Sequence, residues 1–234
     1  MTVLVVALAL LAVTVIAGAV DEKRGAQDPG SPSRVARPSG EKTQTDRSPG
    51  GDVDTRIRWR SSKAVGKPWS GRLVGGVKLP PQGRLFFTWD PVRNASPNRA
   101  YRRFGTSRLI RMTLGVLRSH AAEHPRAPRV GIGDLSRRQG GDFGERFGGL
   151  GHSSHQNGLD VDVYYPRRDG REREPRRPAQ VDRGLAQDLV DRFVAAGAQF
   201  VFVGPNTGLT GPRRVVQSIA HHDNHMHVRI PKHK

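Results

Sequence analysis

The sequence contains no cysteine, and this absence removes several kinds of chemistry at once. Disulfide bridges, iron–sulfur clusters, zinc sites built on thiolates and cysteine nucleophiles are all excluded. A metal ion in this protein would therefore be held by histidine and carboxylate side chains. Apolar residues are also scarce, since the hydrophobic fraction is 35% of 234 residues and the aromatic fraction is 6%. Part of the chain is therefore expected not to fold, while the rest is long enough to bury a core.

Acidic residues are few relative to basic ones. The chain has 39 Lys and Arg residues against 21 Asp and Glu residues, which gives a formal net charge of +18. Such a balance favours a polyanionic partner, for example nucleic acid, an anionic membrane surface or an acidic cell-wall polymer. Arginine, glycine and proline are all abundant, which a biased nucleotide composition would also produce. Charge alone therefore does not decide between these partners.

The N-terminus carries the longest apolar run of the sequence. Residues 3–20 are apolar or small except for Thr14. The run is long for a signal-peptide core and just long enough to cross a membrane. Residues 17–19 (Ala-Gly-Ala) fit the small-x-small pattern of a cleavage site, although no basic segment precedes the run. Residues 1–20 are therefore predicted to be a signal peptide or a membrane anchor, and either indicates export to the periplasm, the cell wall or the medium.

Composition divides the remaining chain into a linker and a domain. Residues 21–70 are rich in Pro, Gly, Ser and charged residues and are predicted to form a disordered linker. Residues 71–234 are predicted to form an α+β domain, because helices and strands mix without strict β–α–β alternation. A small antiparallel sheet, flanked by helices, is expected to carry the functional site. The predicted helices are 106–122 and 182–196, and the predicted strands are 84–89, 129–132, 161–165, 200–203 and 225–230.

Four histidines lie close together near the C-terminus, between positions 221 and 227. His225 and His227 are two positions apart, so a strand would place both imidazoles on one face. There they could meet one ion, or one ion and its water. Exposed and unrelated histidines also occur at this spacing, so the pair alone is a moderate signal.

A second cluster combines histidines with carboxylates. His155 is followed by a turn at 157–158 and then by Asp160 and Asp162, which would share one strand face, so either carboxylate could bind a metal. One imidazole and one carboxylate from this stretch, with one imidazole from the C-terminal pair, would supply three ligands. Three protein ligands with an open fourth position are typical of catalytic zinc, which acts as a Lewis acid and activates water.

These residues resemble a known group of zinc peptidases. The pattern H-x-x-G-x-x-x-D at 155–162, followed by H-x-H at 225–227, is similar to the signature of the lysostaphin, D-Ala-D-Ala metallopeptidase and hedgehog group. The segments 133–162, 104–106 and 222–229 resemble the penicillin-insensitive murein endopeptidases more closely. The combined signal is much more specific than either half alone.

The resemblance implies a role for each residue. By it, the zinc ligands are His155, Asp162 and His227. His225 would not bind the metal but would assist proton transfer or stabilise the oxyanion. His152 would lie beside the metal, as a supporting residue or as an extra ligand.

Two further residues, His222 and Asp160, are candidates for positions close to the metal ligands. His222 matches another histidine of the family. Asp160 is predicted to form hydrogen bonds near the site. That it is an ordinary carboxylate at the edge of a strand is an equally good interpretation. Both are therefore predicted to lie around the metal rather than to bind it.

The implied function is zinc-dependent hydrolysis of peptide cross-links in peptidoglycan, of the D-Ala to diaminopimelate type. Its substrates would be stem peptides, whose carboxylates suit a basic cleft. Two other functions stay open, a metal-dependent nuclease and a non-catalytic cell-wall-binding module. The export signal and the motif spacing count against nucleic acid as a partner, and the complete ligand set counts against a module without activity. The sequence leaves the oligomeric state open.

Overall fold

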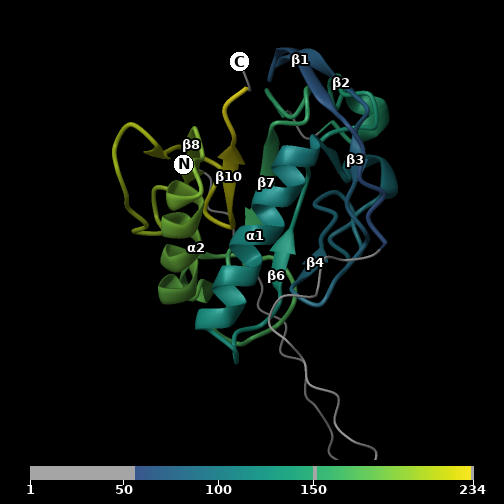
Figure 1. The fold of residues 1–234 in the computed structure, drawn as a ribbon. Helices are drawn as coiled ribbons and strands as arrows, with labels where there is room; N and C mark the ends of the chain where they lie inside the picture. The colour runs from purple at the N-terminus through teal and green to yellow at the C-terminus, as the bar shows by residue number, and fades with distance from the viewer. Residues whose placement is uncertain (1–55, 150–151, 233–234) are drawn as a thin grey trace, which may run out of the picture. The chain divides into compact units, whose positions relative to one another are not determined.

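The computed structural model describes residues 56–149 and 152–232 of the chain. Helices and strands mix in this part without regular alternation, which confirms the α+β class (Figure 1). No helix among the described residues is long and apolar enough to cross a membrane. The elements, besides three short 3-10 turns, are β1 (Lys63–Lys67), β2 (Ser70–Val74), β3 (Val77–Lys78), β4 (Phe86–Thr88), β5 (Phe104–Gly105), α1 (Ser107–Glu123), β6 (Val130–Ile132), β7 (Asp160–Tyr164), α2 (Arg183–Ala195), β8 (Phe200–Val203), β9 (Val216–Ser218) and β10 (His225–Arg229).

The main sheet has six strands in the order β4-β6-β7-β10-β8-β9. The three central pairs, β6–β7, β7–β10 and β10–β8, are antiparallel. The outer pairs, β4–β6 and β8–β9, are parallel. The predicted antiparallel sheet is therefore present at the centre of a mixed sheet. Two further sheets, β1–β2 and β3–β5, have two strands each.

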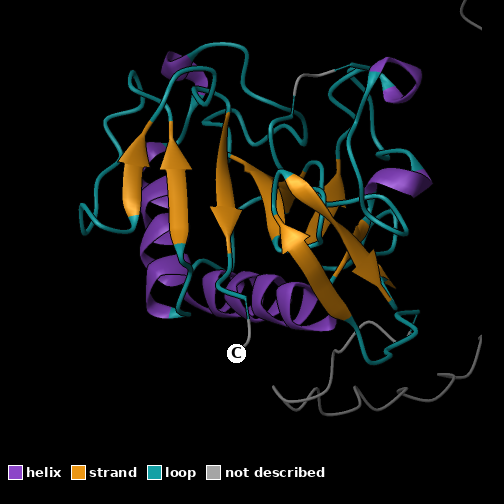
Figure 2. Ribbon diagram, turned by 90° about the horizontal axis from the view of Figure 1, so that it is seen from above, coloured by secondary structure: helices purple, strands orange, loops and turns teal. Residues whose placement is uncertain are grey.

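Alternation along the two central strands separates the core from the opposite face of the sheet. Val161 and Val163 on β7, with Met226 and Val228 on β10, are fully buried in one hydrophobic cluster with apolar residues of α1 and α2. The residues between them point to the other face, because successive side chains of a strand alternate. Both helices lie on the core side of the strands (Figure 2). The other face is left free for polar side chains.

Local capping explains where both helices begin. The Thr106 side chain accepts a hydrogen bond from Leu109 N at 3.2 Å, and the Asp182 side chain accepts one from Leu185 N at 3.1 Å. Such caps satisfy donors that a helix N-terminus leaves unpaired. Gly197 follows the end of α2 with a left-handed φ of 86°, which a glycine adopts without strain. Both predicted helices are confirmed, and their boundaries differ by about one residue.

The predicted linker extends too far toward the C-terminus. Ile57 and Ala64 are 5% and 6% exposed within the core, and β1 pairs with β2 along its whole length. Only one residue of each of these two strands is buried. The two strands therefore need few apolar residues, and their composition resembles that of a linker. Residues 56–70 therefore belong to the folded unit and not to the linker. The rest of the predicted linker and the apolar run at 3–20 lie outside the described residues.

Asp188 on α2 forms a polar link between the two helices. Its Oδ2 lies 2.6 Å from His120 Nδ1 on α1 and accepts a hydrogen bond from Arg192 Nε at 2.6 Å. Burial alone would raise the pKa of Asp188, but the hydrogen bonds from Arg192 and His120 outweigh it and lower the pKa to about 2. The carboxylate is therefore more stable as an anion in the folded chain than in the unfolded chain.

Replacing Asp188 by Asn is expected to destabilise the fold in a pH-dependent way. The unfolded carboxyl titrates near pH 4, so a native pKa of about 2 is worth on the order of 2 kcal/mol above pH 4, and this is lost as the pH falls through 2. Urea unfolding of Asp188→Asn should therefore show a loss of about 2 kcal/mol at pH 7 and a smaller loss at pH 3. The exposed Asp191→Asn serves as the control. An equal loss from Asp188→Asn at both pH values would contradict the charge-based explanation.

Candidate metal centre

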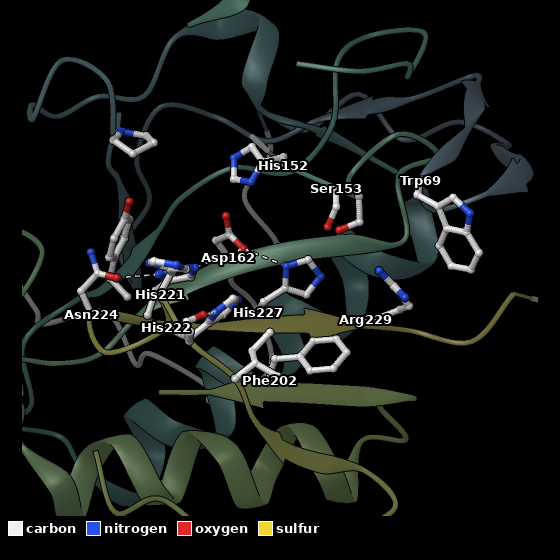
Figure 3. A pocket seen from close by; sticks show the side chains of 16 residues that line it. Trp69, His152, Ser153, Asp162, Phe202, His221, His222, Asn224, His227 and Arg229 are labelled. Atoms are coloured by element: carbon white, nitrogen blue, oxygen red, sulfur yellow. Dashed lines mark hydrogen bonds and ion pairs between the residues drawn. The ribbon is translucent and has the colours of Figure 1, made fainter. Parts of the chain in front are cut away.

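The antiparallel register of β7 and β10 brings the two histidine clusters together. His227 on β10 lies opposite Asp162 on β7, and Arg229 lies opposite Asp160. These residues alternate with the core residues, so they share the face of the sheet that the helices do not cover. Figure 3 shows Asp162 and His227 facing each other from the two strands. The structure thus joins the two stretches that the sequence predicts to converge.

His155 reaches the same point from the loop before β7. Its φ is 68°, a left-handed conformation that is costly for a residue other than glycine, and Gly158 completes the turn with a φ of 76°. The side chain is fully buried, and its Nδ1 lies 2.7 Å from Leu135 O. A carbonyl oxygen only accepts, so Nδ1 carries the proton and the Nε2 lone pair faces the site. The costly backbone conformation thus presents one imidazole nitrogen in a defined orientation.

Three candidate ligand atoms form a compact triangle. His155 Nε2 lies 3.2 Å from both His227 Nδ1 and Asp162 Oδ1, and the latter two atoms are 3.3 Å apart. Ligands of a tetrahedral zinc ion, at about 2.0–2.2 Å from the metal, are separated by about 3.3–3.5 Å. Asp162 Oδ1 is also buried without a hydrogen bond, as expected of an oxygen that accepts a cation. The three side chains therefore fit an ion of this size and ligand preference.

Supporting contacts hold His227 in place. Its Nε2 lies 2.8 Å from Asp160 Oδ1, and Arg229 Nε donates to the same oxygen at 2.7 Å. A carboxylate behind a histidine fixes its orientation and raises its basicity as a metal ligand. Burial lowers the pKa of His227, but the adjacent carboxylates of Asp160 and Asp162 outweigh this effect and raise the pKa to about 9. The site therefore strongly favours a positive charge at this position.

His152 lies close to the same group of side chains. One ligand atom from each of His152, His155 and Asp162 lies within 4.8 Å of the others, so His152 is a further candidate ligand. Its Nε2 lies 2.7 Å from Asp134 Oδ2, much as His227 Nε2 lies 2.8 Å from Asp160 Oδ1. His227 is kept as the third corner of the triangle because its Nδ1 lies 3.2 and 3.3 Å from the other two ligand atoms.

His225 and His222 lie on the other side of Asp162. His225 Nδ1 is 2.6 Å from Asn224 Oδ1, and its Nε2 is 3.8 Å from Asp162 Oδ1. Nδ1 therefore carries the proton, and Nε2 faces the site with a free lone pair. Burial lowers the pKa of His225 to about 4, so its imidazole is neutral at pH 7. The His222 ring is centred 4.8 Å from that of His225, and its Nδ1 lies 2.7 Å from Ala220 O.

Comparison with protein families gives the site a context. The family model of the penicillin-insensitive murein endopeptidases matches residues 64–198, more than half of the chain. The chain belongs to this family. A search of curated proteins gives no match. The family match includes His155 and Asp162 but ends before His225 and His227, so the β7–β10 register supplies the connection between the two halves of the site.

Membership in the murein endopeptidase family makes peptidoglycan the substrate class and peptide-bond hydrolysis the reaction class. The pocket around the triangle has a volume of about 790 Å³, and its lining residues include the aromatic residues Trp69, Tyr164 and Phe202. Figure 3 shows Trp69 and Phe202 in this lining. Trp69 is 54% exposed, so its ring is available for contact with substrate. Trp89, in contrast, is buried in a small hydrophobic cluster with Phe87 and Tyr164.

Asp134, the buried partner of His152, was not predicted from the sequence. Asp134 is fully buried, forms an ion pair with the buried Arg102 and accepts a hydrogen bond from Asn98 Nδ2 at 2.9 Å. Asp134 belongs to the segment that resembles the family, but its partners come from a loop far earlier in the chain. Sequence spacing carries no signal for such a pairing. The contacts show that Asp134 orients His152 from beneath.

A second group of possible ligands in the described part of the chain consists of His120, His124 and Asp188. It joins α1 to α2 on the core side of the sheet and lines no part of the pocket around the triangle. Asp188 is already bonded to Arg192, as described above. We therefore assign this group to the packing of the two helices.

Proposed function

We propose that the protein is a zinc-dependent endopeptidase that hydrolyses peptide cross-links of the D-Ala to diaminopimelate type in peptidoglycan. Family membership supports the substrate class. The observation that carries the zinc proposal is the triangle of His155, Asp162 and His227, with sides of 3.2, 3.2 and 3.3 Å. Zinc held by three such ligands supplies a Lewis acid and makes water a nucleophile at neutral pH.

The residues around the ion have separate proposed roles in proton transfer and in orienting the ligands. His225 has its free Nε2 close to the Asp162 ligand oxygen, where it can accept a proton from the attacking water and pass it to the leaving amine. Its low pKa keeps the imidazole neutral at pH 7, so the Nε2 lone pair carries no proton. Asp160 orients His227, and Asp134 orients His152.

The remaining predicted residues receive supporting roles in this proposal. His152 stays close enough to act as an extra ligand or as a donor to the substrate. His222 packs beside His225 and closes one side of the pocket. Both positions favour substrate orientation over the chemical step itself.

We also infer that the enzyme is exported, because its substrate lies outside the cytoplasmic membrane. The apolar run at 3–20 is the feature of the sequence that supports export, as a signal peptide or as an anchor. Mass spectrometry of the protein recovered from cell fractions tests this proposal. A mature protein that lacks residues 1–19 supports the signal peptide, and intact protein in the membrane fraction supports the anchor. Intact protein in the cytosol would contradict export.

Digestion of purified cross-linked muropeptides tests the activity. The zinc-loaded chain is expected to convert muropeptide dimers to monomers, to lose this activity in the presence of a chelator, and to regain it when zinc is added back. Equal product with and without the chelator would contradict the zinc mechanism. Plasmid DNA incubated with the same preparation is expected to stay intact, whereas nicking would favour the nuclease alternative.

Replacing Asp160 by Asn is expected to weaken zinc binding without abolishing it. The amide keeps the size of the side chain but removes the charge behind His227, and changes of this kind typically cost about 10–100-fold in metal affinity. Competition with a chromophoric chelator measures the effect. Arg229→Gln is the control, because it leaves the contact between Asp160 and His227 in place. An equal loss of affinity in both variants would contradict the orienting role of Asp160.

A further inference from the structure

A second pocket, of about 400 Å³, shares no lining residue with the pocket around the triangle. Its walls come from the segment before β1, the end of β3 with the prolines that follow it, strand β5, and the loop after β6. No acidic residue lines this pocket, and six of its lining residues are cationic: Arg56, Arg58, Arg60, Lys78, Arg103 and Arg138. We call it the cationic pocket.

Five of the six cationic residues of the cationic pocket lack an acidic partner within the described part of the chain. Apart from Arg56, none of its six cationic residues has a carboxylate within 4.0 Å among the described residues. Some arginines elsewhere, such as Arg99, Arg129 and Arg167, pair with an Asp or Glu side chain, so the distinctive feature of the pocket is that several cations that are unpaired within the described residues lie together. Cations gathered without counter-charges repel one another, so an anion in the pocket would relieve this repulsion.

Arg103 forms a buried part of the pocket wall. It is only 6% exposed, and its Nη1 donates to Leu79 O at 2.6 Å. Its Nε is buried and has no hydrogen-bond acceptor. Burial without a carboxylate partner lowers the pKa of Arg103, so its charged form is held at a cost. An anion bound next to it would compensate the charge.

We propose that the cationic pocket binds a phosphate group of a phosphate-bearing cell-wall polymer. Guanidinium groups match the oxygens of a phosphate with paired hydrogen bonds, and a negatively charged tetrahedral phosphate group can accept several of them at once. A cell-wall polymer is favoured over single-stranded nucleic acid because Phe104 is the one aromatic residue among the pocket's described lining, whereas single strands are bound on successive aromatic rings. The pocket would bind the enzyme to the surrounding polyanionic polymer, and this binding would not depend on zinc or on cleavage.

Calorimetric titration of the full-length, zinc-loaded chain with sulfate tests the proposal. Sulfate is a tetrahedral dianion that resembles a phosphate group and does not remove zinc, and acetate at matched ionic strength is the carboxylate comparison. Sulfate is expected to bind more tightly than acetate. The double variant Arg58→Gln/Arg138→Gln is expected to bind sulfate at least about 10-fold more weakly, because it removes two of the pocket's cations.

The matched control is Arg118→Gln/Arg126→Gln, which removes two exposed arginines outside the pocket and is expected to leave sulfate affinity within about 2-fold. An equal loss in both double variants, or no preference for sulfate over acetate, would overturn the proposal. A polymer of glycerol phosphate is expected to bind more tightly than a single-stranded oligonucleotide of equal charge. The reverse order would overturn the assignment to the cell wall.

Discussion

His227→Ala is expected to abolish both zinc binding and cleavage of muropeptide dimers. The substitution removes one corner of the triangle, whose two other ligand atoms, on His155 and Asp162, are 3.2 Å apart. Because a catalytic metal supplies several kcal/mol of transition-state stabilisation, kcat/KM should fall by at least about 10³-fold. Atomic absorption on the purified variant and product analysis by mass spectrometry measure the two effects separately.

Two other histidine variants make the loss in His227→Ala interpretable. His124→Ala removes the half-buried histidine that directly follows α1 and lies outside the pocket, and it should keep both zinc and activity. His152→Ala should keep one zinc per chain, because His155, Asp162 and His227 would still supply the three ligands of the triangle. Stoichiometric zinc in His227→Ala would refute the role of His227 as a ligand. If, in addition, His152→Ala lost its zinc, His152 would be the ligand and His227 the neighbouring residue.

His225→Ala is expected to separate metal binding from the chemical step. The His225 Nε2 lies 3.8 Å from the candidate ligand oxygen of Asp162, too far from the triangle to complete it but close enough to exchange a proton with a nearby water. The variant should therefore retain one zinc per chain, while kcat falls by about 10²–10⁴-fold and KM changes little.

The neighbouring His222→Ala provides the comparison for His225→Ala. Its ring stacks near His225 but bonds to a backbone carbonyl, so its loss should reduce kcat much less. If His225→Ala lost its zinc, His225 would be a ligand, and the proposed division of roles would be wrong. If kcat stayed at the level of the unmodified chain, another group would have to carry the proton.

Local signals account for the parts of the fold that the sequence predicted correctly. The apolar spacing of both long helices, with Thr106 and Asp182 as their caps, lies within a few neighbouring residues and needs no tertiary information. Strands β1, β2, β3, β5 and β9 were not predicted. They have two to five residues and few buried side chains, so pairing rather than residue pattern defines them.

The candidate site also has parts that local sequence motifs predict and parts that depend on tertiary packing. His155, Asp162 and the two histidines of β10 lie in short motifs, and these could be predicted from spacing and resemblance. The choice of Leu135 O and Asp134 as supporting partners depends on how distant segments pack, and no local pattern encodes it. The cationic pocket was hidden for another reason, because its arginines are part of an excess that is spread along the whole chain.

Titration of the metal-free chain with zinc, with muropeptide cleavage followed at each addition, tests the central claim most directly. If a single ion held by His155, Asp162 and His227 is required, activity should rise in proportion to added zinc and level off at one equivalent per chain. Full activity before any zinc is added, or a plateau reached only at two equivalents, would contradict the single-ion mechanism.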